Sequence, residues 1–153
     1  YALKWDGYYY RAIVTAPDVE AVPEHCINYF YNTDDILWLA RITQVECGND
    51  IFENQLATAN VIVNRVKSPQ FPSTVYDVVF DRRGGAVQFP PAFTNKIYLT
   101  PKTSCIIAAK CALNGDNNIG PCLFFLSKKL DSGSWVARNK TYYTSVGGHM
   151  FYY

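Results

Sequence analysis

The sequence lacks any uninterrupted apolar stretch of the roughly 18 to 20 residues that a bilayer-spanning helix needs. We therefore expect no membrane span. Its first residues, Tyr1 to Trp5, also lack the basic region followed by an apolar region that marks a secretory signal peptide. Because the first residue is not Met, we expect a processed or shortened chain, and the location of the protein cannot be read from a leader.

An excess of charge of one sign is also missing. The chain has 14 Lys and Arg residues against 13 Asp and Glu residues, and no basic cluster is visible. Proteins that bind nucleic acid ordinarily carry a basic patch or stripe. The near balance of charge therefore predicts that nucleic acid is not a partner.

Paired cysteine motifs are absent. The five Cys residues form no C-x-x-C pair and have no His at the spacing of a zinc site, so we expect no metal and no other cofactor. The odd count leaves at least one free thiol. Cys105 and Cys111 are six residues apart on one predicted helix and face different directions, which excludes a bridge between them. Our hypothesis is a Cys111–Cys122 disulfide, which leaves Cys26, Cys47 and Cys105 outside that pair.

Aromatic residues, by contrast, are plentiful. They make up 16% of the chain and include 12 Tyr, and the length of 153 residues matches the prior for one domain. A chain of this size buries enough apolar surface to fold without a metal or a disulfide. Flat amphipathic rings also suit surfaces that bind sugars or other polar ligands with apolar faces.

The first 33 residues differ from the rest. Tyr8-Tyr9-Tyr10 and Tyr29-Phe30-Tyr31, with two proline breakers between them, predict an irregular aromatic arm or short strand that packs on the body. Residues 34–153 show no internal repeat and no low-complexity segment. We expect them to form one compact unit, with residues 1–33 as its N-terminal arm.

Glu46 stands near the end of an almost wholly apolar helical run that is capped by Thr33 and stopped by Gly48-Asn49-Asp50. Burial disfavours the charged carboxylate, and the negative end of the helix dipole acts in the same direction, so both raise its pKa. A carboxyl group tuned in this way can act as a general acid near neutral pH. The alternative is that Glu46 pairs with Arg41 or projects into solvent.

The second predicted helix opens with Asp50 and Glu53, which have the spacing of a capping box. It continues to about Val66 with apolar residues at alternating spacings of four and three, an amphipathic stripe. Asn60 and Asn64 lie off this stripe. We expect them on a solvated face rather than in contact with a ligand.

The later part of the chain predicts helices followed by a small sheet, and the fold class is therefore α+β, mainly α. The predicted elements are a short helix at 74–80, a turn at Arg83-Gly84-Gly85, a helix from a Thr100 cap to Asn114-Gly115, and β-prone segments at 123–126 and 150–153, with Gly147-Gly148 as a hinge.

The chain resembles the bacterial cell-wall hydrolase family of spore cortex-lytic enzymes, of the SleB and CwlJ type. The resemblance covers residues 36–153 in order. Its most specific string is Asn64-Arg65-Val66-Lys67-Ser68-Pro69 followed by Phe71-Pro72. The other matching blocks are Leu39-Ala40-Arg41 through Glu46, Glu53 to Ala57, Gln88-Phe89, Leu99-Thr100-Pro101, Ala112 to Gly115, and Gly148-His149-Met150-Phe151.

The resemblance implies a lysozyme-like, lytic-transglycosylase-like helical body with a small C-terminal β-region, and a peptidoglycan substrate. Glu46 occupies the catalytic position of the family's Ala-Glu-Ala motif. Here Val45 and Cys47 replace the alanines, and residues 124–127 stand where the family has an aromatic triplet before Asn-Pro. Neither departure removes the acid.

The implied reaction is that of a lytic transglycosylase. Protonated Glu46 would donate to the glycosidic oxygen between N-acetylmuramic acid and N-acetylglucosamine, and would then take the proton of the muramic C6 hydroxyl, which closes a 1,6-anhydro ring. A hydrolytic glycosidase needs a second carboxylate about 5 to 9.5 Å away. Asp50 and Glu53 are the near candidates, and both have capping explanations, which favours the single-acid route.

Substrate contacts are assigned to four further residues. Gln88 is a candidate hydrogen-bond partner of an N-acetyl group, and Phe89 and Phe125, with Phe93, are candidates for stacking on sugar faces. His149 matches the family's His block, and it orients a ligand or Glu46 or is a satisfied structural His.

Three alternatives stay open. One is a hydrolytic muramidase or glucosaminidase. Another is a cysteine amidase or peptidase that pairs Cys47 or Cys122 with His149. The third is a peptidoglycan-binding module without catalysis. For each, we expect peptidoglycan strands as the partner, a monomer with or without an accessory wall-binding protein, and secretion to the cell wall or spore cortex.

Overall fold

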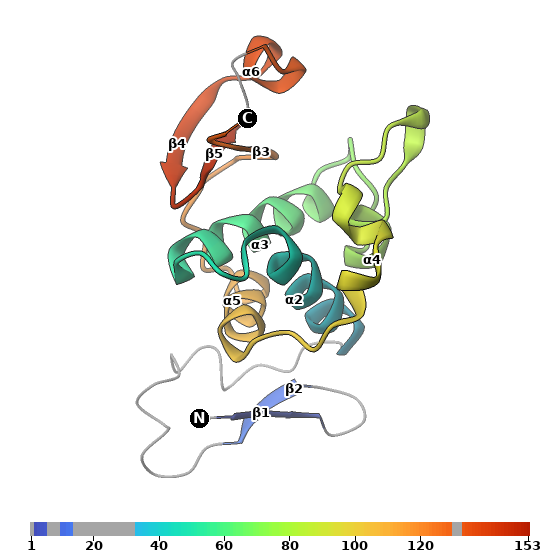
Figure 1. Ribbon diagram of the computed structural model, residues 1–153, viewed down its shortest axis with the longest axis vertical. Helices are drawn as coiled ribbons and strands as arrows, with labels where there is room; N and C mark the ends of the chain where they lie inside the picture. The colour runs from blue at the N-terminus through green and yellow to red at the C-terminus, as the bar shows by residue number, and fades with distance from the viewer. Residues whose placement is uncertain (1, 6–9, 14–32, 130–132) are drawn as a thin grey trace.

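A three-helix bundle beneath a small sheet forms the body of the molecule in the computed structural model, which describes residues 2–5, 10–13, 33–129 and 133–153. Helix α3 lies between the sheet and the pair α2 and α5, which also contact each other (Figure 1). The elements are β1 (Ala2–Trp5), β2 (Tyr10–Ile13), α2 (Thr33–Cys47), α3 (Phe52–Lys67), α4 (Val75–Val79), three 3-10 turns η2 (Arg83–Gly85), η3 (Pro90–Phe93) and η4 (Asn95–Tyr98), α5 (Thr103–Leu113), β3 (Phe124–Ser127), α6 (Trp135–Asn139), β4 (Tyr142–Val146) and β5 (His149–Tyr152).

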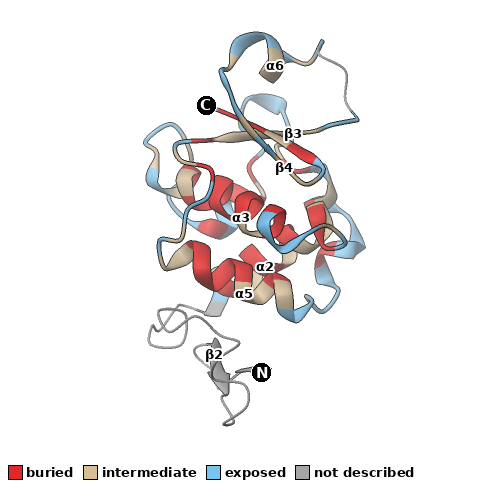
Figure 2. Cartoon of the chain, turned by 90° about the vertical axis from the view of Figure 1, so that its left-hand side faces the viewer, coloured by how far each residue is buried: buried red, intermediate tan, exposed pale blue. Residues whose placement is uncertain are grey.

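The core lies where α2, α3 and α5 face one another, and the buried residues follow the inner faces of these helices (Figure 2). Leu39 and Ile42 of α2 and Ile62 of α3 have no exposed surface there. A second cluster fills the space between α3 and the sheet and includes Val61 and Phe151. Helix α3 is thus buried on two sides, which explains why ten of its residues are buried.

The sheet has the order β3-β5-β4 with antiparallel neighbours, and it pairs Phe125 with Phe151 and Ser127 with His149. The predicted class, mainly helical with a small C-terminal sheet, is confirmed. Strand β4 and helix α6 were not predicted, because neither has a strong apolar period. None of the described helices combines the length and the apolar character that a bilayer crossing requires.

The start of α3 differs from the prediction. The helix begins at Phe52 after Ile51, which makes no side-chain cap, so the capping box of Asp50 and Glu53 is wrong. Asp50 instead accepts hydrogen bonds from the backbone N–H of Ile51 at 2.7 Å and of Gly148 at 2.7 Å. The partner in the β4–β5 turn is 98 residues away in the sequence, and it outcompetes the local cap.

The β4–β5 turn is therefore held, and the predicted Gly147-Gly148 hinge is a tight turn resting on Asp50. Gly147 has a φ of 53°, and a Cβ atom added there would lie 2.5 Å from Asp50 Oδ1. A side chain at this position would be strained and would also collide with the carboxylate. The two glycines allow the close approach that joins the sheet to the α2–α3 corner.

Helix α5 begins at Thr103, three residues after the predicted cap Thr100, and the residue in the N-cap position, Lys102, makes no side-chain cap. The side chain of Gln44 explains the delay, because Nε2 donates to Thr100 O at 2.9 Å and Oε1 accepts from Lys102 N. The predicted helix end at Asn114-Gly115, the short helix after Thr74 and the turn at 83–85 are confirmed.

The expected solvated face at Asn60 and Asn64 is wrong. Asn60 is buried and donates through Nδ2 to Leu56 O at 3.0 Å and to Asp116 O at 2.7 Å. Asn64 donates to Gly120 O and to Cys122 O, each at 2.9 Å. Both amides satisfy backbone carbonyls of the loop that links α5 to the sheet, which is why polar residues stand on this side of α3.

The Cys111–Cys122 disulfide is also wrong, because both thiols are free and buried. Cys122 packs in the cluster between α3 and the sheet. Cys47 and Cys105 are likewise free, and Cys26 lies outside the described residues. Buried free Cys residues here act as small apolar side chains.

The predicted N-terminal arm falls mostly outside the described residues. Strands β1 and β2 form a two-stranded antiparallel sheet that pairs Ala2 with Ile13 and Trp5 with Tyr10. The packing of residues 1–33 as an arm stays a prediction, as does the Thr33 cap, whose side chain is not among those described.

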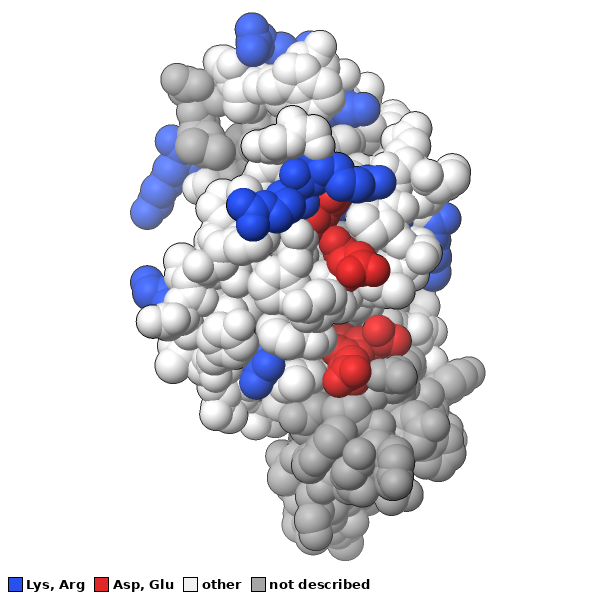
Figure 3. All heavy atoms as spheres, turned by 90° about the vertical axis from the view of Figure 1, so that its right-hand side faces the viewer, with Lys and Arg blue, Asp and Glu red and all other residues white. Residues whose placement is uncertain are grey.

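On the face shown in Figure 3, basic and acidic side chains lie next to one another on a mostly uncharged surface.

Candidate active site

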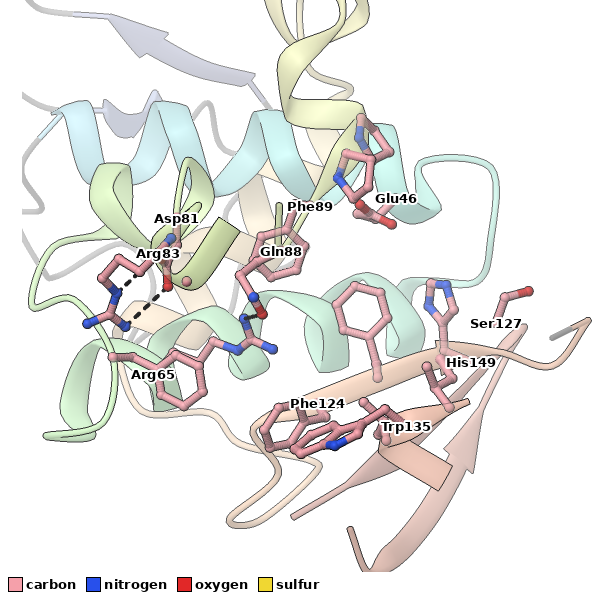
Figure 4. A pocket seen from close by; sticks show the side chains of 17 residues that line it. Glu46, Arg65, Asp81, Arg83, Gln88, Phe89, Phe124, Ser127, Trp135 and His149 are labelled. Carbon is pink, nitrogen blue, oxygen red and sulfur yellow. Dashed lines mark hydrogen bonds and ion pairs between the residues drawn. The ribbon is translucent and has the colours of Figure 1, made fainter. Parts of the chain in front are cut away.

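Glu46 lies in the last turn of α2, where two clefts meet. The larger cleft has a volume of about 730 Å³ and lies between the sheet and the segment 81–91, and the smaller has a volume of about 480 Å³ and follows the α2–α3 corner. Glu46, Ser127 and His149 line both. Figure 4 shows the Glu46 carboxyl group at one end of the larger cleft, facing the His149 side. A long ligand can therefore lie on both sides of this carboxyl group.

Burial raises the pKa of Glu46 from 4.5 to about 7. Half-buried at the helix end, the carboxyl group receives no hydrogen bond from the side chains and backbone that the structure describes. Arg41 does not pair with it, because its guanidinium lies 4.9 Å from the Trp38 ring and 5.9 Å from the Tyr98 ring. A large fraction of Glu46 thus carries a proton at neutral pH, which is the state that a general acid requires.

The four other predicted site residues, Gln88, Phe89, Phe125 and His149, all line the larger cleft together with Glu46. Gln88 and Phe89 come from segment 81–91, Phe125 comes from β3 and His149 from β5, and the fold brings these three parts of the chain together around one cleft. Phe93 does not line the cleft. Its ring packs on Phe80 at 5.6 Å, so its predicted stacking on a sugar at this site is wrong.

The aromatic residues of the cleft differ in exposure. Phe89 is only 3% exposed and stacks on Phe125 at 6.0 Å, so it forms the wall of the cleft. Phe125 also lies 4.8 Å from the His149 ring. Because Phe125 is the more exposed of the two phenylalanines, it is the one placed to contact a ligand.

His149 is held by residues of α3. Its Nδ1 lies 3.0 Å from Asn54 Nδ2 and 3.2 Å from Asn54 Oδ1, and Asn54 Nδ2 donates to Asp50 Oδ2 at 2.8 Å. Burial lowers the pKa of His149, so the ring is neutral at neutral pH. Asp50 and Asn54 therefore fix the orientation of a neutral imidazole beside Glu46.

The other carboxylates of the clefts have partners. Partial burial acts to raise the pKa of Asp50, but hydrogen bonds from Asn54, Gly148 and Ile51 hold it below its ordinary value. Asp81 is likewise kept ionised, because hydrogen bonds and an ion pair at 3.0 Å from Arg83 outweigh its partial burial. Glu46 is the carboxyl group among the cleft residues whose pKa is raised.

The thiols near the site are unreactive. Burial raises the pKa of Cys47 to about 12, and its Sγ contacts Thr43 O at 3.4 Å and Thr58 Oγ1 at 3.4 Å. Burial also raises the pKa of Cys122 to about 11. A thiolate nucleophile needs a lowered pKa and access to a ligand, and neither Cys has both. Within the described ranges, no group of three or more His, Cys, Asp or Glu residues could hold a metal ion.

Sequence reasoning did not identify the far end of the larger cleft, which contains Arg65, Arg83, Phe124 and Trp135. Arg65 was named from the sequence only as part of the segment Asn64 to Pro69 that resembles the family, without a role of its own. Trp135 lies on helix α6, which was not predicted. The signal available in the sequence for Arg65 was its place between the apolar residues Val63 and Val66 of the helix.

Comparisons with known proteins agree with this geometry. The sequence model of the Cell Wall Hydrolase family matches residues 49–152, and the match begins three residues after Glu46. A spore cortex-lytic enzyme of Bacillus cereus is 31% identical over 121 residues, which are 79% of this chain and 45% of that protein. One of Halalkalibacterium halodurans is 30% identical over 142 residues, 89% of this chain and 40% of that protein. The chain thus spans less than half the length of these relatives.

Two solved structures have the same fold. The catalytic domain of the germination-specific lytic transglycosylase SleB from Bacillus anthracis matches with a TM-score of 0.70 and 30% identity, covering 80% of this chain and 97% of that domain. The catalytic domain of the Bacillus cereus SleB protein matches with a TM-score of 0.71 and 29% identity, covering 86% and 98%. The predicted lysozyme-like fold is confirmed by these matches.

Proposed function

The chain belongs to the cell wall hydrolase family, and on this premise we propose that it cuts the glycan strands of peptidoglycan as a lytic transglycosylase. The scissile bond joins N-acetylmuramic acid to N-acetylglucosamine, and Glu46 is the general acid and then the base. The observation that carries the proposal is a carboxyl group with a pKa of about 7 at the meeting point of two clefts. The names of the relatives and of the solved SleB domain support it.

The reaction uses one proton-carrying group. As the bond between C1 and the glycosidic oxygen breaks, the oxygen takes the proton of Glu46 and leaves with the N-acetylglucosamine unit. The Glu46 carboxylate then takes the proton of the muramic C6 hydroxyl, whose oxygen bonds to C1 and closes the 1,6-anhydro ring. Glu46 ends protonated, and no water is consumed. A pKa near the working pH suits both transfers.

The surroundings of Glu46 favour this route over hydrolysis. A hydrolytic enzyme places a second carboxylate about 5 to 9.5 Å from the acid, either to activate water or to attack the sugar. Of the carboxylates that line the two clefts, Asp50 is occupied by three hydrogen bonds and Asp81 by its ion pair with Arg83. Neither is free for that role.

The remaining site residues position the strand. Phe125 offers a half-buried ring next to His149, and His149 offers a neutral imidazole whose orientation Asn54 fixes. Gln88 accepts a hydrogen bond from Arg65 at 3.3 Å, which leaves its amide nitrogen for a sugar substituent. Phe89 supports Phe125 from behind.

The proposal extends to where the chain acts. The relatives are named for the spore cortex, so we place the target outside the cytoplasmic membrane, in the cortex or the vegetative wall. Residues 34–153 are proposed as the catalytic unit and residues 1–33 as its arm. We also propose that the unit is a monomer.

Digestion of purified peptidoglycan in water enriched in oxygen-18, followed by mass spectrometry, tests the reaction. Transglycosylation gives anhydro-muropeptides without the heavy isotope, because water does not enter the product. Hydrolysis gives reducing-end sugars that carry it and would replace the proposed mechanism. Freed stem peptides would support the thiol alternative, and the absence of products would leave only a binding module.

A further inference from the structure

Arg65 is a charged residue of the larger cleft that the proposed reaction does not use. It is only 4% exposed, yet it lines the cleft. Its guanidinium carbon lies 4.6 Å from the Phe71 ring, 5.0 Å from the Phe89 ring and 5.2 Å from the Phe124 ring. Figure 4 shows its guanidinium next to Gln88, on the side of the cleft away from His149, with the Asp81–Arg83 pair farther from Glu46. The three rings fix the guanidinium at the distal end of the cleft.

Only part of the hydrogen-bonding capacity of this guanidinium is used within the protein. Nε donates to Leu123 O at 2.7 Å and Nη1 to Gln88 Oε1 at 3.3 Å. A guanidinium has five N–H donors, and no hydrogen bond from Nη2 is formed to the residues that the structure describes. Burial lowers the pKa of Arg65 only to about 10, so it is charged at neutral pH. A cation with free donors therefore faces the cleft.

The charges around this end favour an anion. Arg83 and Asp81 are paired at 3.0 Å and offset each other. Lys140 adds a further positive charge, because its Nζ lies 4.9 Å from the Phe124 ring and 5.7 Å from the Trp135 ring. Asp81 also interacts with the charge of Arg65. Counted over the described residues of this end, the three cations Arg65, Arg83 and Lys140 share this one carboxylate, so the net charge is positive.

Trp135 provides an apolar platform at the same end. It is 57% exposed on helix α6, lines the cleft, and packs edge-on against Phe124 at 6.4 Å. Tryptophan that is fixed at one edge and open on a face is suited to packing against a sugar ring.

We propose that the distal end of the larger cleft is a subsite for a muramic acid unit beyond the scissile bond, in which Arg65 binds a carboxylate of the muramic substituent and Trp135 packs against the sugar ring. The inference rests on the proposed function for its substrate class. The carboxylate comes either from the lactyl group or from the attached peptide. Arg is suited to this contact because its planar donors match the two oxygens of a carboxylate.

Calorimetric titration of the Glu46→Gln chain, which should leave strands uncut, tests the subsite. The probes are soluble peptidoglycan strands and the same strands after their carboxyl groups are coupled to methylamine, which removes the charge and keeps the sugars. We expect coupling to weaken binding at least about tenfold, as for the loss of a charge-assisted contact. Equal binding of the two probes would overturn the proposal, and this comparison needs no change at Arg65.

Variants then locate the contact. Arg65→Met should bind both probes as weakly as the unaltered site binds the coupled strands. Lys140→Gln, on the surface, should lower the preference for charged strands by about threefold, whereas the control Lys96→Gln should keep it. Trp135→Ala should weaken both probes alike, by about fivefold. If Lys128→Gln in the smaller cleft removes the preference and Lys140→Gln does not, the assignment to the distal end is wrong.

A third probe separates the two sources of the carboxylate. An amidase removes the peptides by hydrolysing the amide that joins them to the lactyl group, and so leaves a free lactyl carboxylate on each treated muramic unit. Affinity that is kept or increased assigns the contact to the lactyl group, and a loss assigns it to the peptide. Binding is measured without cleavage. A chain that discriminates between the probes but cuts no wall would therefore keep the subsite and refute the proposed function.

Discussion

Replacing Glu46 with Gln should stabilise the folded chain at alkaline pH, even though it removes the proposed proton donor. Burial raises the pKa of Glu46 from its ordinary value of 4.5 to about 7. Between these values the folded chain holds a proton that the unfolded chain releases, so the free energy of unfolding falls as the pH rises through this window. Gln has nearly the same shape and is neutral at every pH, so the variant does not lose this stability.

The structure sets the size of the effect. The rise of the pKa from 4.5 to about 7 corresponds to an upper bound of roughly 3 kcal/mol, at about 1.4 kcal/mol for each tenfold change in proton affinity. Glu46 is only half-buried and faces the clefts, so water screens part of this cost. We expect Glu46→Gln to raise the free energy of unfolding by about 2 kcal/mol at about pH 8 and to change it little at about pH 4.

Urea unfolding of both proteins at the two pH values measures this difference. Glu53→Gln is the matched control, because Glu53 is an exposed glutamate in the first turn of α3, and it should show no pH-dependent gain. An equal effect of Glu46→Gln at both pH values would show that the carboxylate is not desolvated. A loss of stability at the higher pH would show that it has a cationic partner. Either result would refute the reasoning.

Other predictions concern the pH profile, the thiol and the turn. Cleavage measured as kcat/KM should fall as the pH rises through about 7, because only protonated Glu46 donates, and a rate that stays constant to about pH 9 would contradict this. Cys47→Ser should keep activity within about threefold, and iodoacetamide should not inactivate the enzyme, because the thiol has a pKa of about 12. Gly147→Ala should destabilise the fold by about 1 to 3 kcal/mol in urea, from its positive φ and its collision with Asp50, and an unchanged midpoint would mean that the turn is not held there.

The sequence was sufficient where the signal is local. Helices and strands could be predicted where neighbouring residues form a clear pattern, and the structure has the corresponding elements. These patterns are the apolar run ending at Glu46, the helix-breaking residues after Val66, and the β-prone segments at 123–126 and 150–153. Glu46 could be singled out because a carboxylate in an apolar helical run needs an explanation.

Contacts between distant segments decided what the sequence could not show. Asp50 stands three residues before Glu53, which is the spacing of a helix cap, but its carboxylate accepts a hydrogen bond from Gly148 N instead. Asn64 has the spacing of a solvated face, but it binds the carbonyls of Gly120 and Cys122. In each case the polar partner comes from a loop whose position depends on the whole fold, so helical periodicity gives no access to it.

The distal end of the cleft was missed for a related reason. Arg65 and Trp135 are 70 residues apart in the sequence, and Trp135 lies on a helix of five residues that has no apolar period. Only the packing of both around Phe124 makes them neighbours. The resemblance to a family supplied the acid and the substrate class, but it did not show how the far end of the cleft is built.

The central claim is that Glu46 supplies the proton for glycan cleavage, and its removal tests this claim most directly. Release of anhydro-muropeptides from purified peptidoglycan at about pH 6 should fall at least about a thousandfold in Glu46→Gln and stay within about twofold in Glu53→Gln, with both proteins folded. Cleavage by Glu46→Gln at a rate similar to that of the unaltered chain would contradict the account.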